Sequence, residues 1–124
     1  MDTPEIDFAI VMTSGPETPQ RLASPFFLAA TAAAEDMTVV VYFTGMGTQL
    51  LKRGVAESVY PKAGGKSVKQ FMDLALENGA QFVLCKTSMD LFDISESDIV
   101  FNAPGVSVAA ALPYLESSKR LLSF

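Results

Sequence analysis

The side chain in this protein that is best suited to chemical reaction is a cysteine. Cys85 is the only cysteine among 124 residues, and no histidine is present. The lack of histidine excludes serine triads, histidine-based metal sites and the usual proton shuttle at neutral pH. By residue type alone, a free cysteine is more often a small buried hydrophobe than a reagent. Its position in the chain shifts that balance toward reactivity.

Cys85 ends the apolar segment QFVLC, residues 81–85, which predicts a buried strand, and the following KTSMDLF, residues 86–92, predicts a turn into a helix. Reactive groups collect at the carboxyl ends of parallel strands. The free N–H groups of a helix start, together with a nearby lysine, would stabilise a thiolate and lower the pKa of the thiol. The residues that we expect to stabilise the thiolate or to form its pocket are Lys86, Thr87, Ser88 and Met89.

A lone thiol also restricts the reaction. An internal disulfide cycle needs a second cysteine, and a cysteine phosphatase would need an arginine where Leu91 stands. One thiol can still accept a group, such as a sulfane sulfur, and hand it to another protein. Cys85 is therefore the residue that we expect to be catalytic.

Two glycine-rich segments resemble nucleotide-binding motifs only in part. In GMGTQL, Gly45 and Gly47 match a dinucleotide fingerprint, but Leu50 occupies the position of its third glycine. In YPKAGGKS, residues 65–67 end like a phosphate-binding loop, but Tyr60 stands where that motif opens with glycine. A tight turn before a short helix at 48–54, and a plain loop before a helix, are the better interpretations. Gly45 and Gly47 could still line a pocket at the strand ends.

No cofactor or metal is expected. The carboxylates that follow Cys85 match no calcium-binding loop, and helix-capping or solvent-exposed roles are the better interpretation for them. These residues are Asp90, Asp93, Glu96 and Asp98.

Apolar segments and helical segments alternate along the chain. Buried strands are predicted at 6–14, 37–45, 81–85, 98–103 and 120–124, and helices at 26–36, 66–79 and 107–118, the last bent at Pro113. The helix at 26–36 is apolar nearly all round and should be covered on all sides. Ser67 and Gln70 have the spacing of a capping box, and Gly79 should end that helix. This order predicts one α/β domain over residues 1–124, a three-layer α/β/α sandwich with a mostly parallel five-stranded sheet.

The composition indicates which kinds of partner are expected. The net charge is -5, without a basic cluster, so neither nucleic acid nor an anionic membrane surface is an expected partner. No apolar run reaches the length of a membrane span, and the acidic N-terminus is unlike a secretory signal. Hydrophobic residues make up 49% of the chain, which predicts homo-oligomers that cover apolar surface. A single unpaired cysteine is typical of the cytoplasm.

Three stretches together resemble the DsrE/DsrF-like family of small sulfur-relay proteins. They are SPFFLAATAAAEDMTVVVYFTGMGTQLLKRG, VLCKTSMDLFDI and FNAPGVSVAAALPYL, and the resemblance covers most of the chain. It implies a three-layer α/β/α domain, frequent homo- or hetero-oligomers, and a persulfide-carrying cysteine at the position of Cys85. With the single thiol, this resemblance leads us to expect a sulfur carrier, with sulfurtransferase activity left open. The implied partners are sulfur-donor and sulfur-acceptor proteins.

Two other functions stay open on the sequence. The chain could be a noncatalytic structural or regulatory subunit of a sulfur-relay assembly, with Cys85 buried as core. It could also be a small-ligand binding module, with a cleft formed by Gly45, Gly47 and the strand end at Cys85.

Overall fold

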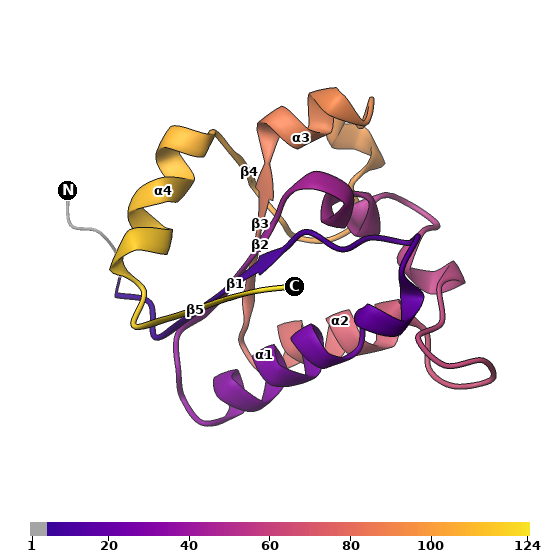
Figure 1. Ribbon diagram of the computed structural model, residues 1–124, viewed down its shortest axis with the longest axis horizontal. Coiled ribbons are helices and arrows are strands. Elements are labelled where there is room, and N and C mark those ends of the chain that lie inside the picture. Colours follow the sequence, from indigo (N-terminus) through magenta and orange to yellow (C-terminus); the bar gives the residue numbers. More distant parts are fainter. Residues whose placement is uncertain (1–4) are drawn as a thin grey trace.

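The computed structural model describes residues 5–124, so the first four residues of the acidic N-terminal segment lie outside it. Five strands form one sheet in the order β4-β3-β2-β1-β5, and every neighbouring pair is parallel (Figure 1). The strands are β1 (Phe8–Met12), β2 (Val39–Phe43), β3 (Gln81–Cys85), β4 (Gly105–Val106) and β5 (Arg120–Ser123). The α-helices are α1 (Ser24–Ala34), α2 (Val68–Glu77), α3 (Lys86–Leu91) and α4 (Val108–Ser117).

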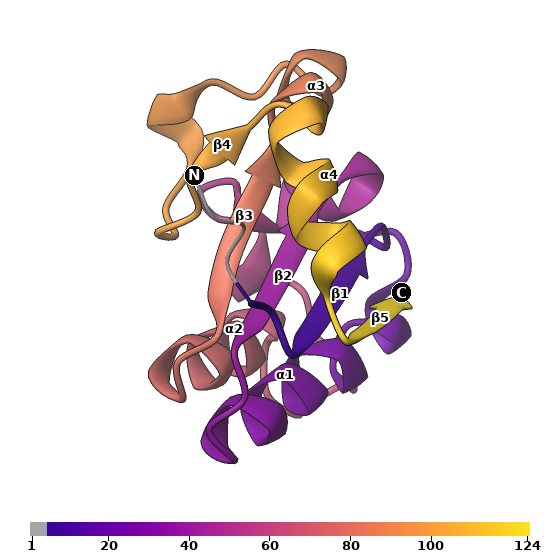
Figure 2. The same ribbon diagram turned by 90° about the vertical axis from the view of Figure 1, so that its left-hand side faces the viewer.

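Helices cover both faces of the sheet, but unequally. Figure 2 shows α4 alone in front of the sheet, α1 and α2 together on the side away from α4 in the lower part of the picture, and α3 at the end where the central strands finish. The prediction of a three-layer α/β/α sandwich is confirmed, and the sheet is entirely parallel. The reason is that β1 and β2 are apolar on both faces, which requires cover on both sides.

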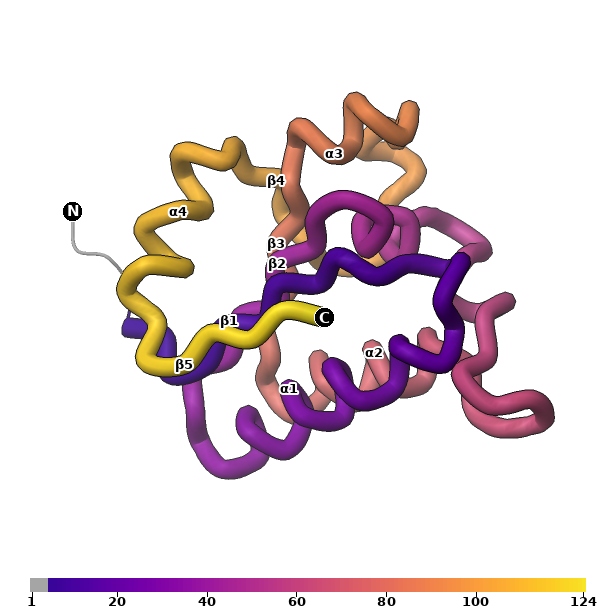
Figure 3. Tube along the Cα trace, viewed as in Figure 1, coloured from indigo at the N-terminus to yellow at the C-terminus, as the bar shows by residue number. Residues whose placement is uncertain are grey.

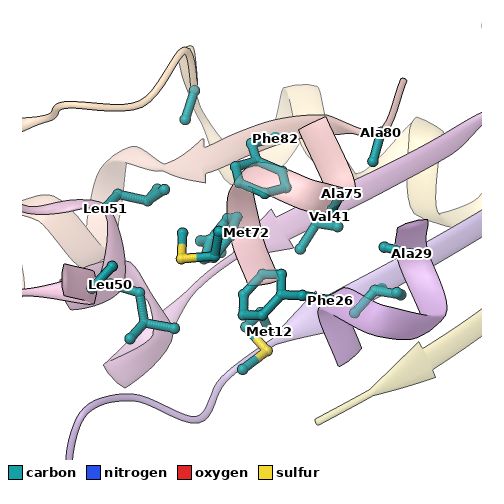
Figure 4. Packing of buried hydrophobic residues seen from close by; sticks show 14 of the residues in the cluster. Met12, Phe26, Ala29, Val41, Leu50, Leu51, Met72, Ala75, Ala80 and Phe82 are labelled. Carbon is teal, nitrogen blue, oxygen red and sulfur yellow. The ribbon is translucent and has the colours of Figure 1, made fainter. Parts of the chain in front are cut away.

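The main core lies between the sheet and the pair α1 and α2. Three fully or almost fully buried rings meet there, with centroids 5.9 Å apart for Phe26 and Phe43, 6.1 Å for Phe26 and Phe82, and 5.0 Å for Phe43 and Phe82. Such spacing gives aromatic pairs their preferred tilted and offset contacts. Figure 4 shows Phe26 from α1 and Phe82 from β3 within this layer, with Met72 from α2 beside them. This face of the sheet is therefore a rigid base for the strand ends.

The second helix follows its sequence signals closely. Ser67 accepts a hydrogen bond from the Gln70 amide, and the Gln70 side chain accepts one from the Ser67 amide, which is the predicted capping box. Gly79 has a φ of 107°, a left-handed conformation that glycine adopts without strain, and it follows the end of α2 as expected.

Two predicted elements need correction. The fourth strand is not at 98–103: Glu96–Asp98 form a 3-10 turn, Ile99 makes one antiparallel bridge with Lys52, and the strand β4 is only Gly105–Val106. The apolar run there follows the edge of the core instead of pairing with β3. The helix expected at 48–54 is a 3-10 helix that spans Gly45–Leu51.

The first helix also departs from expectation on one side. It is not covered all round, because Phe27 is 57% exposed while Phe26, its neighbour in sequence, is fully buried. The loop before α2 contains a short 3-10 helix, Ala56–Ser58, and residues 62–66 are exposed. Figure 3 shows this loop projecting from the body of the domain.

The aromatic cluster gives a test of the core with a built-in control. Phe26→Ala should lower the free energy of unfolding by about 3–5 kcal/mol, because it removes a fully buried ring and leaves a cavity. Phe27→Ala, the same change one residue along the same helix, should cost less than about 1 kcal/mol. Urea denaturation followed by circular dichroism measures both. Equal losses would mean that the two rings do not face the core and the solvent as described.

Candidate functional site

Cys85 is the last residue of β3 and the residue directly before α3. Only 3% of it is exposed. It lies on the α4 face of the sheet, in a small cluster with Tyr42 of β2 and Ala111 of α4. The cysteine is therefore at the carboxyl edge of a central strand, as the sequence predicts, but beneath a helix and not open to solvent.

The surroundings of the thiol favour its ionised form. Burial alone would raise the pKa of Cys85, but hydrogen bonds from the Tyr42 and Ser88 hydroxyls, the Ser88 amide and the Thr44 hydroxyl outweigh it and lower the pKa from 9.0 to about 7. The same contact acts in reverse on Tyr42, whose pKa is raised by burial and by its hydrogen bond to Cys85. The phenol therefore stays protonated and can donate to the thiolate at neutral pH.

The ionisation is coupled to folding. Because the pKa of Cys85 is lower in the folded chain than its ordinary value of 9.0, the thiolate contributes stability that is fully present above about pH 9. That contribution is lost as the pH falls through about 7.

Ser88 connects the two loops of the site. Its hydroxyl oxygen accepts a hydrogen bond from the Gly45 amide at 2.8 Å and lies 3.2 Å from the Thr44 hydroxyl oxygen. Ser88 is buried, so this contact fixes the start of α3 against the turn that follows β2. The structure thus brings Gly45 and Ser88, two of the predicted site residues, to the same strand edge as Cys85.

The two glycines have different physical roles. Gly45 has a φ of 56° and open space where a side chain would stand, so the backbone conformation is what favours glycine there. Gly47 is buried, and a Cβ at this position would lie 2.2 Å from the Met12 carbonyl oxygen. Close packing of its loop on β1 therefore accounts for Gly47.

The other predicted residues of α3 point in several directions. Lys86 and Thr87 are exposed, and the Lys86 side chain runs beside Gly105 of β4. Lys86 is not among the groups that lower the pKa of Cys85. Met89 is buried in the main core on the α1 and α2 side. Of the α3 residues, Ser88 is the one whose side chain meets the thiol.

Sequence reasoning missed Tyr42 and Thr44. The available signal was a single tyrosine in the otherwise aliphatic and aromatic run VVVYF, followed by a threonine at the strand end. That signal has meaning only once the register is known, in which Tyr42 pairs with Val83 and Phe43 with Leu84, so that Thr44 comes level with Cys85.

The residues 5–124 contain no cluster of three or more histidine, cysteine, aspartate or glutamate side chains that could hold a metal ion. Asp98 has a local role instead, since its carboxylate accepts hydrogen bonds from the Ser95 amide and hydroxyl. Over the same part of the chain, no helix has the length and apolarity needed to cross a bilayer.

Fold and site together define a small α/β domain with one ionisable thiol at the edge of a parallel sheet. The family model for the DsrE/DsrF-like family matches residues 7–124, and the chain belongs to this family. The crystal structure of YchN from E. coli is similar, with a TM-score of 0.79 and 16% identity over 96% of this chain and 99% of that one. MTH1491 from Methanobacterium thermoautotrophicum, described as a protein of unknown function, has a TM-score of 0.63 and 13% identity over 97% and 99% of the two chains. No curated protein matches the sequence significantly.

The hydroxyl contacts predict the pH dependence of thiol alkylation. In the wild type, the rate of Cys85 alkylation by iodoacetamide should rise with pH around a midpoint near 7. Tyr42→Phe removes one donor to the thiolate, and we expect the midpoint to rise by about one pH unit, which slows alkylation about tenfold at pH 6. Tyr60→Phe, at an exposed tyrosine in the loop before α2, should leave the midpoint unchanged. A midpoint near 9 in the wild type would contradict the assigned contacts.

Proposed function

We propose that this protein is a sulfur carrier that accepts sulfane sulfur on Cys85 as a persulfide and passes it to a partner protein. The observation that carries this proposal is the hydroxyl-lined thiol, whose pKa is about 7 although it is buried. A large part of Cys85 is therefore thiolate at neutral pH, and the thiolate is the nucleophile in sulfur exchange. Membership of the DsrE/DsrF-like family supports the same function.

The reaction balances without an oxidant or a reductant. The Cys85 thiolate attacks the outer sulfur of a donor persulfide, a new S–S bond forms at Cys85, and the S–S bond of the donor breaks with its electron pair leaving on the donor thiolate. A partner thiolate then attacks the outer sulfur on Cys85 and restores the Cys85 thiolate. Because Cys85 is the only cysteine, release of the sulfur requires an external nucleophile such as this partner thiol.

We propose that groups at the start of α3, together with Thr44 after β2, hold the negative charge during transfer. The Ser88 amide and hydroxyl and the Thr44 hydroxyl already donate toward the Cys85 sulfur. In this proposal they also hold the terminal sulfur anion of the persulfide, together with the Thr87 and Met89 amides. Lys86, which is exposed at the same helix start, supplies positive charge to the approaching donor or acceptor.

The burial of Cys85 is the observation that favours the alternative, a noncatalytic subunit in which the cysteine is core. The two functions differ in how the thiol is reached. Ala111 is the only buried residue of α4, so this helix is weakly anchored over Cys85 and its displacement would expose the sulfur. Rapid labelling of Cys85 in the native protein by a thiol reagent would argue against the noncatalytic role.

Sulfur uptake is the direct test. After incubation with a persulfide or polysulfide donor, intact-mass spectrometry of the wild type should show the added mass of one sulfur atom, removable by dithiothreitol. Cys85→Ser should show no such adduct, because no other thiol exists in the chain. No uptake from any donor, or equal uptake by the serine variant, would exclude the carrier function.

We propose that the protein self-associates through the open edge of the sheet at β5. All four β5 residues are exposed, including Leu121 and Leu122, and a pocket of about 610 Å³ separates this edge from α1. An exposed apolar edge strand is a template for pairing with a second chain. A two-fold pairing of β5 with β5 would cover both leucines in each copy.

If β5 forms the interface, a charged substitution in this strand should change the oligomeric state. At micromolar concentrations the wild type should sediment as an oligomer, and Leu121→Lys should shift it toward the monomer, because a charge would have to be buried at the paired edge. Leu91→Lys, at a 71% exposed leucine of α3, serves as the matched control and should leave the distribution unchanged. A strictly monomeric wild type would contradict the proposed interface.

A further inference from the structure

A second pocket lies on the α4 face of the sheet, beside the cysteine. Its volume is about 220 Å³, and residues of β2, β3, β4 and α4 line it. This size is below that of sites for drug-sized ligands and suits a small organic group.

The pocket and the Cys85 cluster have several residues in common. Five residues line the pocket and also pack in the cluster around Cys85. They are Tyr42, Val83, Val106, Ala111 and Leu115. Tyr42 is the most informative of them, because it also donates a hydrogen bond to the Cys85 thiolate. A molecule in the pocket therefore contacts side chains that also pack around the Cys85 thiol, beneath the same weakly anchored helix.

The side chains that line the pocket favour an uncharged donor group over a charged one. No lysine, arginine, aspartate or glutamate lines the pocket, and its polar members are Gln81 and the two tyrosines Tyr42 and Tyr114. An inorganic donor such as thiosulfate carries two negative charges and would meet no cation here. An uncharged hydrocarbon group would instead bury apolar surface against valine, leucine and alanine side chains.

We propose that this pocket binds the apolar organic group of a small persulfide, R–S–SH, and so presents its outer sulfur to Cys85. This inference rests on the carrier function proposed above and names the class of donor. The Cys85 thiolate forms a bond to the outer sulfur, the S–S bond of R–S–SH breaks, and R–S⁻ leaves with the electron pair while the proton stays on the new persulfide. Movement of α4 displaces the side chains that separate the pocket from the thiol. The donor bound in the pocket then lies next to the Cys85 thiolate.

Binding can be tested without sulfur transfer. Benzyl methyl sulfide has an aromatic group beside sulfur but no sulfane sulfur to donate. Added to the Cys85→Ser protein, it should shift amide NMR signals in β2, β3 and α4 in a saturable manner at millimolar concentrations. Shifts that are absent, or that fall on residues of the β5 edge instead, would overturn the proposed site whatever Cys85 does.

Donor selectivity provides the second test, measured as the ratio of Cys85 persulfidation rates with benzyl persulfide and with inorganic polysulfide. Tyr114 lines the pocket but is not part of the cluster around Cys85. Tyr114→Ala removes an aromatic ring whose apolar surface lines the pocket and should lower the ratio by roughly fivefold. Leu112→Ala, at an exposed residue of the same helix that does not line the pocket, should leave the ratio unchanged.

The outcomes separate the two proposals. If Cys85 takes up sulfur but the ratio is the same in the wild type and in Tyr114→Ala, the carrier function stands and the donor site is wrong. If benzyl methyl sulfide binds but Cys85 takes up sulfur from no donor, the carrier function fails, and the pocket is an organic-ligand site and not a donor site. A protein segment that occupies the pocket in place of a small donor would compete with benzyl methyl sulfide and would also overturn the assignment.

Discussion

The site depends on one conflict, which is that a thiol buried in an apolar layer is held with a pKa near 7. Burial disfavours the thiolate, so the compensating donors must be close and correctly directed. They come from separate segments, with Tyr42 and Thr44 at the end of β2 and Ser88 in α3. Ionisation of Cys85 is therefore a property of the packed sheet edge and not of the cysteine segment alone.

The register of two parallel strands brings these donors together. Phe43 is opposite Leu84, so the following residues, Thr44 directly after β2 and Cys85 at the end of β3, come level with each other. The turn at Gly45 then directs its amide to Ser88, which fixes α3 against β2. A shift of the register by one residue would turn Tyr42 to the other face and would leave the thiolate without its phenol donor.

The two faces of the sheet have different roles: one supports the strand ends, and the other gives access to the thiol. The α1 and α2 face is a closely packed core with three buried phenylalanine rings, which keeps the strand ends in place. The α4 face holds the thiol and the adjoining pocket under a helix with one buried residue. The proposed carrier function requires both properties, because the thiolate must be shielded at rest and reached during exchange.

The sequence by itself determined the fold class, the parallel sheet and the place of Cys85 at a strand end, because these follow from local signals. Apolar runs such as 81–85, the capping box at Ser67 and the glycine after α2 each act over a few residues. The fourth strand was misplaced because an apolar run at the margin of the core has the same pattern as a short strand. Only the tertiary structure decided which groups meet the thiol, since Tyr42 and Thr44 are about forty residues away from Cys85 in the chain and become its neighbours through strand register. The same holds for the burial of the sulfur, because Ala111 of α4, 26 residues further along the chain, packs in the cluster around it.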